Sequence, residues 1–271
     1  MKLAIDPRPF PFLLTGARIA VLGYGPGAAH HAVGLRDAGN QVAVGMRAGG
    51  RSWARAVRDG FNPAAACSVV AGASVVAVLV PDEEQPQVYW HAIEPGVAPG
   101  ALLVFGRALA LGTRAFEPRG VDVVLVAAYE LGCRVAVHSD ATGRALERAI
   151  AYARAAFGAD VAIATTTTAA EVDAELAELE SRAGGAAALR ATVETAAARA
   201  RDSHAPDEAH ISYCEGLRAL VDERARRGLR EPVDDRGRRG GGPSDAGRGS
   251  TLALVTGASG ERPTRGTRGK P

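Results

Sequence analysis

The feature that most constrains the fold is the segment of residues 17–46, in which a glycine-rich loop links an apolar stretch to a helical pattern. Residues 17–23 (ARIAVLG) predict a buried strand, residues 28–38 a helix, and residues 41–46 (QVAVGM) a second strand. Continuous apolar strands that alternate with helices are typical of a parallel sheet with both faces covered. The segment therefore predicts a doubly wound α/β fold.

The same alternation continues along the chain to about residue 157. Further strands are predicted at 74–81, 101–106, 121–128 and 135–139, and further helices at 52–60, 83–93 and from residue 145 onward. We therefore expect a mostly parallel Rossmann-like sheet in a domain of residues 1–163. The remainder predicts a short, reduced α-helical domain at 164–230, which is rich in Ala, Glu, Leu and Arg, and a disordered Gly/Arg-rich tail at 231–271.

Charge, apolar runs and cysteines exclude several classes of function. The 32 basic and 30 acidic residues leave a net charge of +2, which favours neither a nucleic-acid partner nor a membrane surface. We see no apolar run long enough to span a bilayer, and prolines interrupt the N-terminal apolar stretch that a signal peptide would need. Three scattered cysteines without a metal-binding pair suit a reducing compartment, so we expect a cytoplasmic protein.

The loop between the first strand and the first helix has the form expected of a dinucleotide phosphate site. It consists of Gly23, Tyr24, Gly25, Pro26, Gly27 and Ala28. Gly23 permits a tight turn, Gly25 lets a pyrophosphate approach the backbone, and Ala28 is small enough for close packing of the helix. The N-terminus of that helix would add free N–H groups and a positive dipole end. The alternative is a purely structural turn.

The segment after the second strand contains three residues that indicate which dinucleotide is bound. An NAD site usually has an acidic residue there, whereas this chain has Arg47, followed by Arg51 and Ser52. Guanidinium groups hold a phosphate through charge-assisted hydrogen bonds, so the residues predict that the 2′-phosphate of NADP binds here. The alternative is a solvated basic loop.

Five segments together resemble the N-terminal domain of ketol-acid reductoisomerase, also called acetohydroxyacid isomeroreductase. They are GYGPGAAHHAVGLRDAG, VGMRAGGRSWARA, VPDEEQPQVY, PGALLVFG and VDVVLVA, in the order found in that family, and the similarity covers residues 16 to about 157. The resemblance implies an NADPH-binding domain of an enzyme of branched-chain amino-acid biosynthesis. The implied cofactor contacts are the loop 23–28, Arg47, Ser52, and Pro81, Asp82 and Gln85 of the PDEEQ segment.

This chain departs from that family at one cofactor-binding position, and three further residues have an alternative role. Gly50 stands where the family usually has a serine, so one phosphate donor is missing. Asp82, Glu83 and Glu84 have the alternative role of capping the helix that follows them.

The residues that carry the family's chemistry are largely replaced. Its isomerisation uses two magnesium ions, which need several carboxylate ligands. Alignment places Glu178 at one ligand position, but the other three positions hold Ala174, Ser212 and Gly216. Arg107 occupies the position of the family's catalytic histidine. The active site is therefore expected to be degenerate, with magnesium unsupported, Glu178 the single candidate ligand, and the catalytic residues unknown apart from Arg107.

The carboxylates of residues 171–180 offer a further candidate for metal binding. Glu171, Glu175 and Glu178 share one helix face by their spacing. Such a face is usually solvated, and one helix cannot surround an ion.

These observations lead to two functional hypotheses. The first is an NADP-dependent oxidoreductase that reduces a small keto or hydroxy acid, with isomerase activity in doubt. The second is a non-catalytic NADP-binding regulatory or partner protein derived from the same family. A homodimer formed through the helical region is a possible assembly under either hypothesis.

Overall fold

The computed structural model describes residues 14–129, 132–203 and 208–228 of the chain. Two compact units are distinguished, residues 1–230 and 231–271, and every described residue belongs to the first. The predicted disordered tail lies outside the described residues. The predicted division between residues 163 and 164 remains a prediction.

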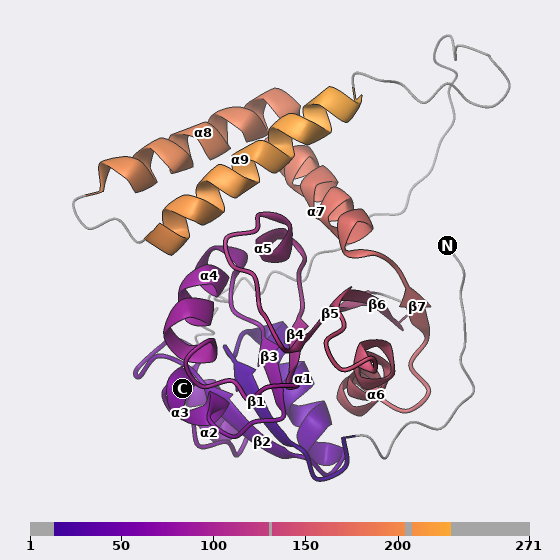
Figure 1. Cartoon of the computed structure of the whole chain (residues 1–271). Helices are drawn as coiled ribbons and strands as arrows, with labels where there is room; N and C mark the ends of the chain where they lie inside the picture. The colour runs from indigo at the N-terminus through magenta and orange to yellow at the C-terminus, as the bar shows by residue number, and fades with distance from the viewer. Residues whose placement is uncertain (1–13, 130–131, 204–207, 229–271) are drawn as a thin grey trace, which may run out of the picture. The chain divides into compact units, whose positions relative to one another are not determined.

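A seven-stranded sheet forms the centre of the first unit (Figure 1). Its spatial order is β2-β1-β3-β4-β5-β6-β7, in which β1 to β5 are parallel, β6 is antiparallel to β5, and β7 is parallel to β6. The strands are β1 (Arg18–Leu22), β2 (Gln41–Gly45), β3 (Val75–Val78), β4 (Leu102–Phe105), β5 (Asp122–Tyr129), β6 (Gly132–Ser139) and β7 (Ile163–Thr165). The predicted doubly wound, mostly parallel sheet is confirmed.

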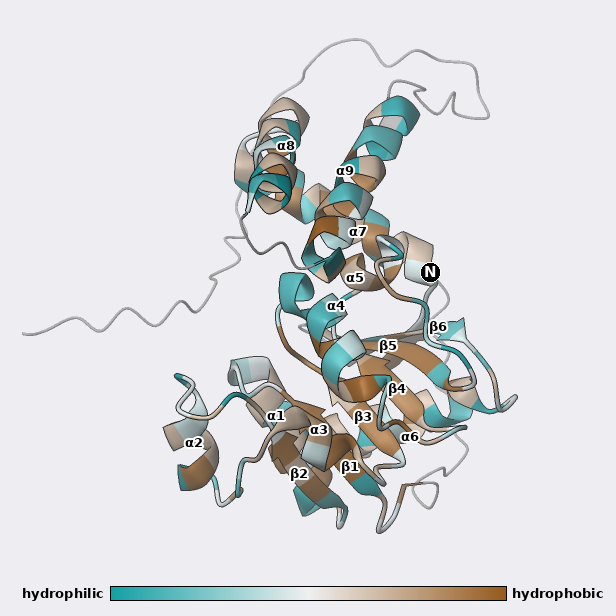
Figure 2. Cartoon of the chain, turned by 60° about the vertical axis from the view of Figure 1, so that its left-hand side comes forward, coloured by the Kyte–Doolittle hydropathy of each residue, from teal (hydrophilic) through white to brown (hydrophobic). Residues whose placement is uncertain are grey.

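Helices cover both faces of this sheet because its strands are apolar on both sides. In β1, Ala20 and Leu22 belong to one buried cluster and Ile19 and Val21 to the other, as expected when side chains alternate. Figure 2 shows the strands as a hydrophobic layer. The covering elements are α1 (Pro26–Asp37), α2 (Trp53–Arg58), α3 (Ala66–Val70), η2 (Asp82–Glu84), α4 (Gln85–Val88), η3 (Tyr89–Ile93), α5 (Leu109–Gly112) and α6 (Ala145–Phe157).

Three short elements were not predicted from the sequence: β7, α3 and α5. Each has five residues or fewer, too few for a hydrophobic period to be recognised. The antiparallel direction of β6 follows from its connection, because only residues 130 and 131 separate it from β5. A parallel neighbour would need a crossover of a dozen or more residues.

The helical region consists of α7 (Thr168–Ala183), α8 (Ala186–Asp202) and α9 (Glu208–Gly228). The side chain of Thr167 caps α7 by accepting a hydrogen bond from the backbone N–H of Ala170, and Gly184 ends it in a left-handed conformation. Val172 and Leu176 of α7 and Val221 of α9 belong to the same buried cluster as Leu22 of β1. The helices therefore share a hydrophobic core with one face of the sheet.

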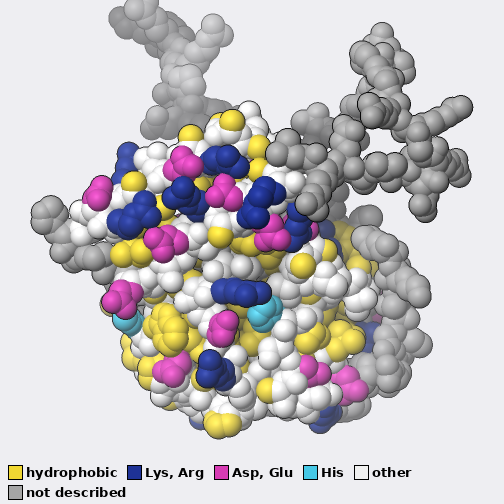
Figure 3. Space-filling view, turned by 45° about the horizontal axis from the view of Figure 1, so that its top comes forward, with side chains coloured by type: hydrophobic (Ala, Val, Ile, Leu, Met, Phe, Trp, Pro, Cys, Tyr) yellow, Lys and Arg dark blue, Asp and Glu magenta, His cyan; other side chains and the backbone are white. Residues whose placement is uncertain are grey.

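Charges of both signs are interspersed on the surface formed by α8 and α9, as Figure 3 shows. Arg190 and Asp222 form an ion pair at 3.2 Å between these helices, as do Arg201 and Glu215 at 3.2 Å. Exposed ion pairs of this kind contribute about 0–1 kcal/mol each to stability, so they add little to the free energy of unfolding. Among the described residues we find no helix with the length and apolarity that a membrane span requires.

A buried polar network closes the end of the sheet at which the parallel strands begin. Asp122, the first residue of β5, is fully buried and accepts hydrogen bonds from the hydroxyl of Thr142 at 2.7 Å and from Nη1 of Arg148 at 2.6 Å. Arg148 of α6 also donates to the carbonyl oxygens of Gly100 and Ser74, which precede β4 and β3. The network ties one helix to the starts of three strands.

Candidate functional site

The opposite end of the sheet, where the parallel strands finish, contains an open cavity of about 830 Å³. Segments that follow β1, β2, β3 and β4 all contribute to its wall. In open α/β sheets, ligands bind outside the carboxyl ends of the strands. The predicted site residues that line it are Gly23, Tyr24, Gly25, Arg47, Arg51, Ser52, Pro81 and Arg107.

The glycine loop presents backbone rather than side chains to this cavity. Gly23 has φ +90°, and a Cβ there would lie 3.0 Å from the carbonyl oxygen of Leu79, so the tight turn requires glycine. At Gly25 and Gly27 a Cβ would meet nothing within 4 Å, so the space beside the loop is open.

Helix α1 begins at this loop and is suited to an anion. Pro26 occupies its first turn, and that turn, which the structure describes in full, contains no acidic residue. Gly25 precedes it as an N-cap without a side-chain hydrogen bond, which leaves backbone N–H groups at the positive end of the helix dipole. Ala28 is buried, as expected of the small residue where the helix packs against the sheet. These residues fit a pyrophosphate group.

Tyr24 contributes to the loop through its backbone, because its side chain turns into the protein. The residue is 2% exposed, and its hydroxyl donates to Oδ2 of Asp59 at 2.8 Å. Its ring packs edge-on against Phe61, with the centroids 5.7 Å apart. The pKa of Tyr24 is raised, mainly by burial and also by the hydrogen bond to Asp59. The tyrosine therefore anchors the loop to the segment after α2.

The basic residues after β2 lie on the cavity wall with their charges accessible. Arg47 has an 80% exposed side chain, and its Nη2 is 2.7 Å from Oε2 of Glu84 in η2. Arg51 is also exposed, and Ser52 is partly buried at the start of α2. Gly50, also on the wall, supplies no side-chain donor. The arrangement fits a phosphate that is held by guanidinium groups.

Arg107 follows β4 and extends over the end of the sheet between two carboxylates. Its Nε donates to Oδ2 of Asp82 at 2.7 Å, and its Nη2 lies 3.7 Å from Oε2 of Glu175 in α7. Glu175 also accepts hydrogen bonds from the backbone N–H groups of Ala108 at 2.8 Å and Leu109 at 3.3 Å. The guanidinium is thus held from two sides, while its side chain remains 41% exposed and lines the cavity.

The three charges alter one another's ionisation. Burial raises the pKa of Asp82 more than the neighbouring Arg107 lowers it, and burial likewise raises the pKa of Glu175. Burial alone would lower the pKa of Arg107, but Asp82 and Glu175 outweigh it and the pKa is raised. Arg107 therefore stays a fixed positive charge on the cavity wall.

Asp82 and Gln85 lie behind this wall instead of on it. Both are buried, and Gln85 donates through Nε2 to the carbonyl oxygen of Val80 at 3.2 Å. Asp82 binds Arg107 and Glu84 binds Arg47, so these two carboxylates hold arginines and do not merely cap the helical segment that they begin. Sequence reasoning had not assigned Glu84 or Glu175 to this site, because their arginine partners come from distant segments.

The residues do not fit the magnesium site that the resemblance raised. Glu178 is exposed and pairs with Arg182 at 3.7 Å, so the predicted single metal ligand points to solvent. The other two acids of its helix face bind arginines, Glu175 with Arg107 and Glu171 with Arg134 at 3.0 Å. No cluster of three or more His, Cys, Asp or Glu side chains suited to a metal occurs within the described ranges.

Gly216 of α9 gives a steric reason for the missing ligand. A Cβ at this position would lie 2.3 Å from the carbonyl oxygen of Thr113, which follows α5. The close approach of α9 to this segment leaves no room for a glutamate. Close helix packing thus occupies a position at which the resemblance would place a ligand.

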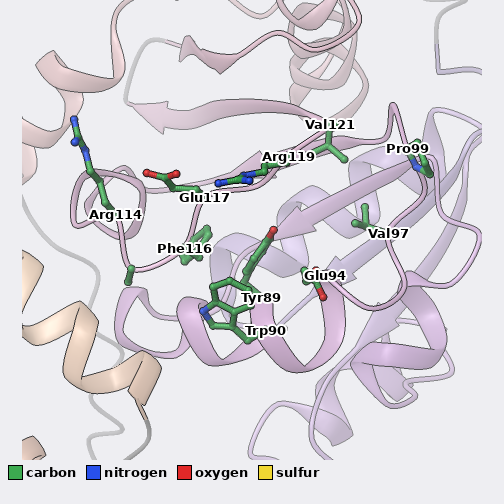
Figure 4. Close-up of a pocket in the computed structure, with 12 residues that line it drawn as sticks. Tyr89, Trp90, Glu94, Val97, Pro99, Arg114, Phe116, Glu117, Arg119 and Val121 are labelled. Carbon is green, nitrogen blue, oxygen red and sulfur yellow. The ribbon is translucent and has the colours of Figure 1, made fainter.

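A second cavity, of about 600 Å³, shares no lining residue with the first and contains none of the predicted site residues (Figure 4). Its floor is aromatic: Tyr89 and Phe116 are buried and stack with centroids 4.7 Å apart, and Phe116 stacks in turn on Phe105 of β4. Tyr89 points toward the extended segment that carries Glu117 and Arg119. The aromatic stack continues the hydrophobic core.

The sheet order, the glycine loop and the cavity at the strand ends define the class of protein as a dinucleotide-binding α/β protein. The family model described as "acetohydroxy acid isomeroreductase, NADPH-binding domain" matches residues 13–162. The chain belongs to this family. Membership supports an NAD(P)-dependent oxidoreductase and agrees with the predicted preference for NADP.

Solved structures show the same fold. An NADH-preferring ketol-acid reductoisomerase from an uncultured archaeon superposes with a TM-score of 0.58 at 24% identity, covering 83% of this chain and 74% of that one. A protein from Jannaschia sp. CCS1, provisionally described as an oxidoreductase, superposes with a TM-score of 0.53 at 15% identity, covering 80% of this chain and 82% of that one. At these identities the similarity concerns the fold alone.

Proposed function

We propose that the protein is an NADP-dependent oxidoreductase that interconverts a small keto acid and its hydroxy acid by hydride transfer and lacks the metal-dependent isomerisation of its family. The observation that carries the proposal is the composition of the 830 Å³ cavity. Its wall combines an open glycine loop, two exposed arginines after β2, and a fixed guanidinium after β4.

The cofactor would be held by groups at the ends of β1 and β2. The N–H groups at the start of α1 suit the pyrophosphate, and Arg47 and Arg51 suit the 2′-phosphate that distinguishes NADP from NAD. When bound, the nicotinamide supplies the hydride.

Arg107 is the residue suited to the substrate. A guanidinium binds a carboxylate through two parallel hydrogen bonds, and its charge polarises a neighbouring carbonyl group. It does not act as an acid because it keeps its proton at any physiological pH. The pairing with Asp82 and Glu175 fixes where this charge lies before a substrate arrives. These are the properties needed to orient a keto acid.

The second candidate function is a non-catalytic NADP-binding regulatory or partner protein. It is supported by the exposed Glu178 and by the close packing at Gly216, which leave the cofactor cavity open while removing the metal site. This alternative predicts cofactor binding without turnover of any keto acid.

Calorimetric titration with NADPH and NADH, with and without magnesium, tests the binding step shared by both candidates. We expect NADPH to bind more tightly than NADH and magnesium to have no effect. Arg47→Ala should weaken NADPH binding by about 1.5–3 kcal/mol, or roughly 10- to 150-fold, because a charge-assisted hydrogen bond is lost. Unchanged NADPH affinity in this variant would show that Arg47 does not bind the 2′-phosphate.

Turnover separates the two candidates. NADPH consumption is measured with a panel of small 2-keto acids and with 2-acetolactate plus magnesium. Turnover of a keto acid that is lost in Arg107→Gln supports the oxidoreductase, and binding without any turnover supports the partner protein. Magnesium-dependent turnover of 2-acetolactate would contradict the loss of isomerase chemistry. We also propose that the protein forms a homodimer and is cytoplasmic. These two proposals rest on the sequence alone.

A further inference from the structure

The ion pair between Arg47 and Glu84 lies across the candidate cofactor cavity. Arg47 follows β2 and Glu84 follows β3, and the sheet order places β1 between these two strands. The pair therefore spans the end of β1, from which the Gly23–Gly25 loop leaves. Both residues line the cavity together with that loop.

The two charges are close but well exposed. Nη2 of Arg47 is 2.7 Å from Oε2 of Glu84, and the side chains are 80% and 37% exposed. Solvent screens such a pair, so it is weak enough for a competing anion to displace it. A phosphate with nearly two negative charges is a stronger partner for a guanidinium than a single carboxylate.

We infer that Glu84 determines cofactor specificity by competing with the 2′-phosphate of NADP for Arg47. The inference rests on the proposed function and adds a residue to it. In the free protein Glu84 occupies the guanidinium that the 2′-phosphate needs. Binding of NADPH must break the ion pair, whereas NADH has no 2′-phosphate and leaves it in place. Glu84 therefore lowers the preference for NADPH.

The ion pair with Arg47 accounts for the acidic side chain of Glu84 on a cavity wall that is otherwise suited to a phosphate. Asp82 is engaged by Arg107, and Glu83 is exposed and forms no ion pair with the residues that the structure describes. Glu84 alone of these three neighbours reaches the basic segment after β2. Glu83 thus offers a matched control with the same charge, one position away.

The test measures NADPH and NADH affinities of five full-length proteins: wild type, Glu84→Gln, Glu83→Gln, Arg47→Gln and the double variant of Glu84 and Arg47. Glu84→Gln should bind NADPH about two- to fivefold more tightly, the range expected for the loss of an exposed ion pair. Its NADH affinity should stay within about twofold of wild type, and Glu83→Gln should match wild type for both cofactors. In the Arg47→Gln background the effect of Glu84→Gln should vanish, because no guanidinium remains to compete for.

Each contrary result has a distinct meaning. If wild type binds NADPH and Glu84→Gln binds it equally or more weakly, the competition is refuted while the proposed function stands. Equal tightening for both cofactors would also refute it, because Glu84 would then obstruct the cavity without regard to the 2′-phosphate. If the folded wild type, checked by circular dichroism, binds neither cofactor, the proposed function itself is wrong. Because the substituted side chains are exposed, we expect all five proteins to fold.

Discussion

An arginine–aspartate pair stands at each end of the same sheet, and the two pairs differ in what surrounds them. At the end where the strands begin, the side chains of Arg148 and Asp122 are 16% and 0% exposed. At the end where the strands finish, those of Arg107 and Asp82 are 41% and 10% exposed, and Arg107 lines a cavity. The same two chemical groups thus serve two different purposes.

The two arginines differ in their partners within the protein and in their exposure to a cavity. Arg148 donates to two carbonyl oxygens as well as to Asp122, and Thr142 supplies further hydrogen bonds to the carboxylate. This network holds strand starts together, and none of its residues lines either of the two cavities described above. Arg107 is fixed by two carboxylates but still faces open space. Exposure toward a cavity, rather than pairing alone, therefore distinguishes the end of the sheet that is suited to a ligand.

The largest expected effect is on stability at the closed end. Asp122→Asn removes the charge that a largely buried Arg148 needs, so we expect a loss of about 3 kcal/mol in the free energy of unfolding at neutral pH. NADPH affinity should be unchanged, since the cavity is at the other end of the sheet. Urea denaturation and calorimetric titration measure the two quantities. The control is Asp160→Asn, because Asp160 is exposed and forms no ion pair in the described part of the chain.

The pH dependence of that loss has a definite sign. Burial raises the pKa of Asp122, but the hydrogen bonds from Thr142 and Arg148 outweigh it and the pKa is lowered. A carboxylate with a lowered pKa stabilises the fold at neutral pH, and this contribution is lost as the pH falls through the lowered value. The gap between wild type and Asp122→Asn should therefore begin to narrow as the pH falls below about 4, the ordinary pKa of an aspartate, and should close once the pH is below the lowered pKa of the folded protein. A gap that persists there would mean that packing, and not charge, holds the network.

At the open end, substitutions of Gly23 and Gly25 should distinguish effects on the stability of the fold from effects on cofactor binding. Gly23→Ala places a Cβ 3.0 Å from a backbone oxygen at φ +90°, so we expect it to destabilise the fold by about 1–3 kcal/mol. Gly25→Ala has an ordinary φ of −67° and meets nothing within 4 Å, so stability should change by less than about 1 kcal/mol.

Cofactor titration completes this comparison. The methyl group of Gly25→Ala would enter the space proposed for the pyrophosphate, and we expect NADPH and NADH both to bind more than about tenfold more weakly, a loss of about 1.4 kcal/mol. Equal losses for the two cofactors would distinguish this variant from Arg47→Ala, which should affect NADPH alone. Unaltered binding by Gly25→Ala would place the pyrophosphate elsewhere.

The sequence was sufficient for the features that depend on neighbouring residues. Gly23, Tyr24 and Gly25 of the glycine loop line the cavity together with Arg47, Arg51 and Ser52, because these segments follow directly on strands of the sheet. Pro26, Gly27 and Ala28 do not line it, and cofactor contact by any of these residues stays a prediction. The strands of the parallel sheet were predictable because their apolar residues are continuous. The helical region was also predictable, because residues 164–230 are rich in Ala, Glu, Leu and Arg, and α7, α8 and α9 lie there.

Contacts between distant segments could not be predicted in the same way. Glu175 is 68 positions after Arg107, and Glu84 is 37 positions after Arg47, so neither pair leaves a local signal. The helix period predicts that Glu171, Glu175 and Glu178 share one face of α7, but each binds a different arginine, and which one depends on packing. Glu178 points to solvent because the helix turns Glu175 toward the sheet. Asp82 and Gln85 are likewise buried behind the cavity wall, and their burial depends on tertiary packing that a local sequence motif does not reveal.

The smallest expected effect concerns Tyr24, the predicted loop residue whose side chain leaves the cavity. Tyr24→Phe removes the hydroxyl that donates to Asp59 at 2.8 Å and keeps the ring that packs on Phe61. We expect a loss of about 1 kcal/mol in the free energy of unfolding, the usual contribution of one hydrogen bond. NADPH affinity should stay within about twofold of wild type, because the hydroxyl is buried and bound to Asp59. A tenfold drop without further loss of stability would instead show that the hydroxyl reaches the cofactor.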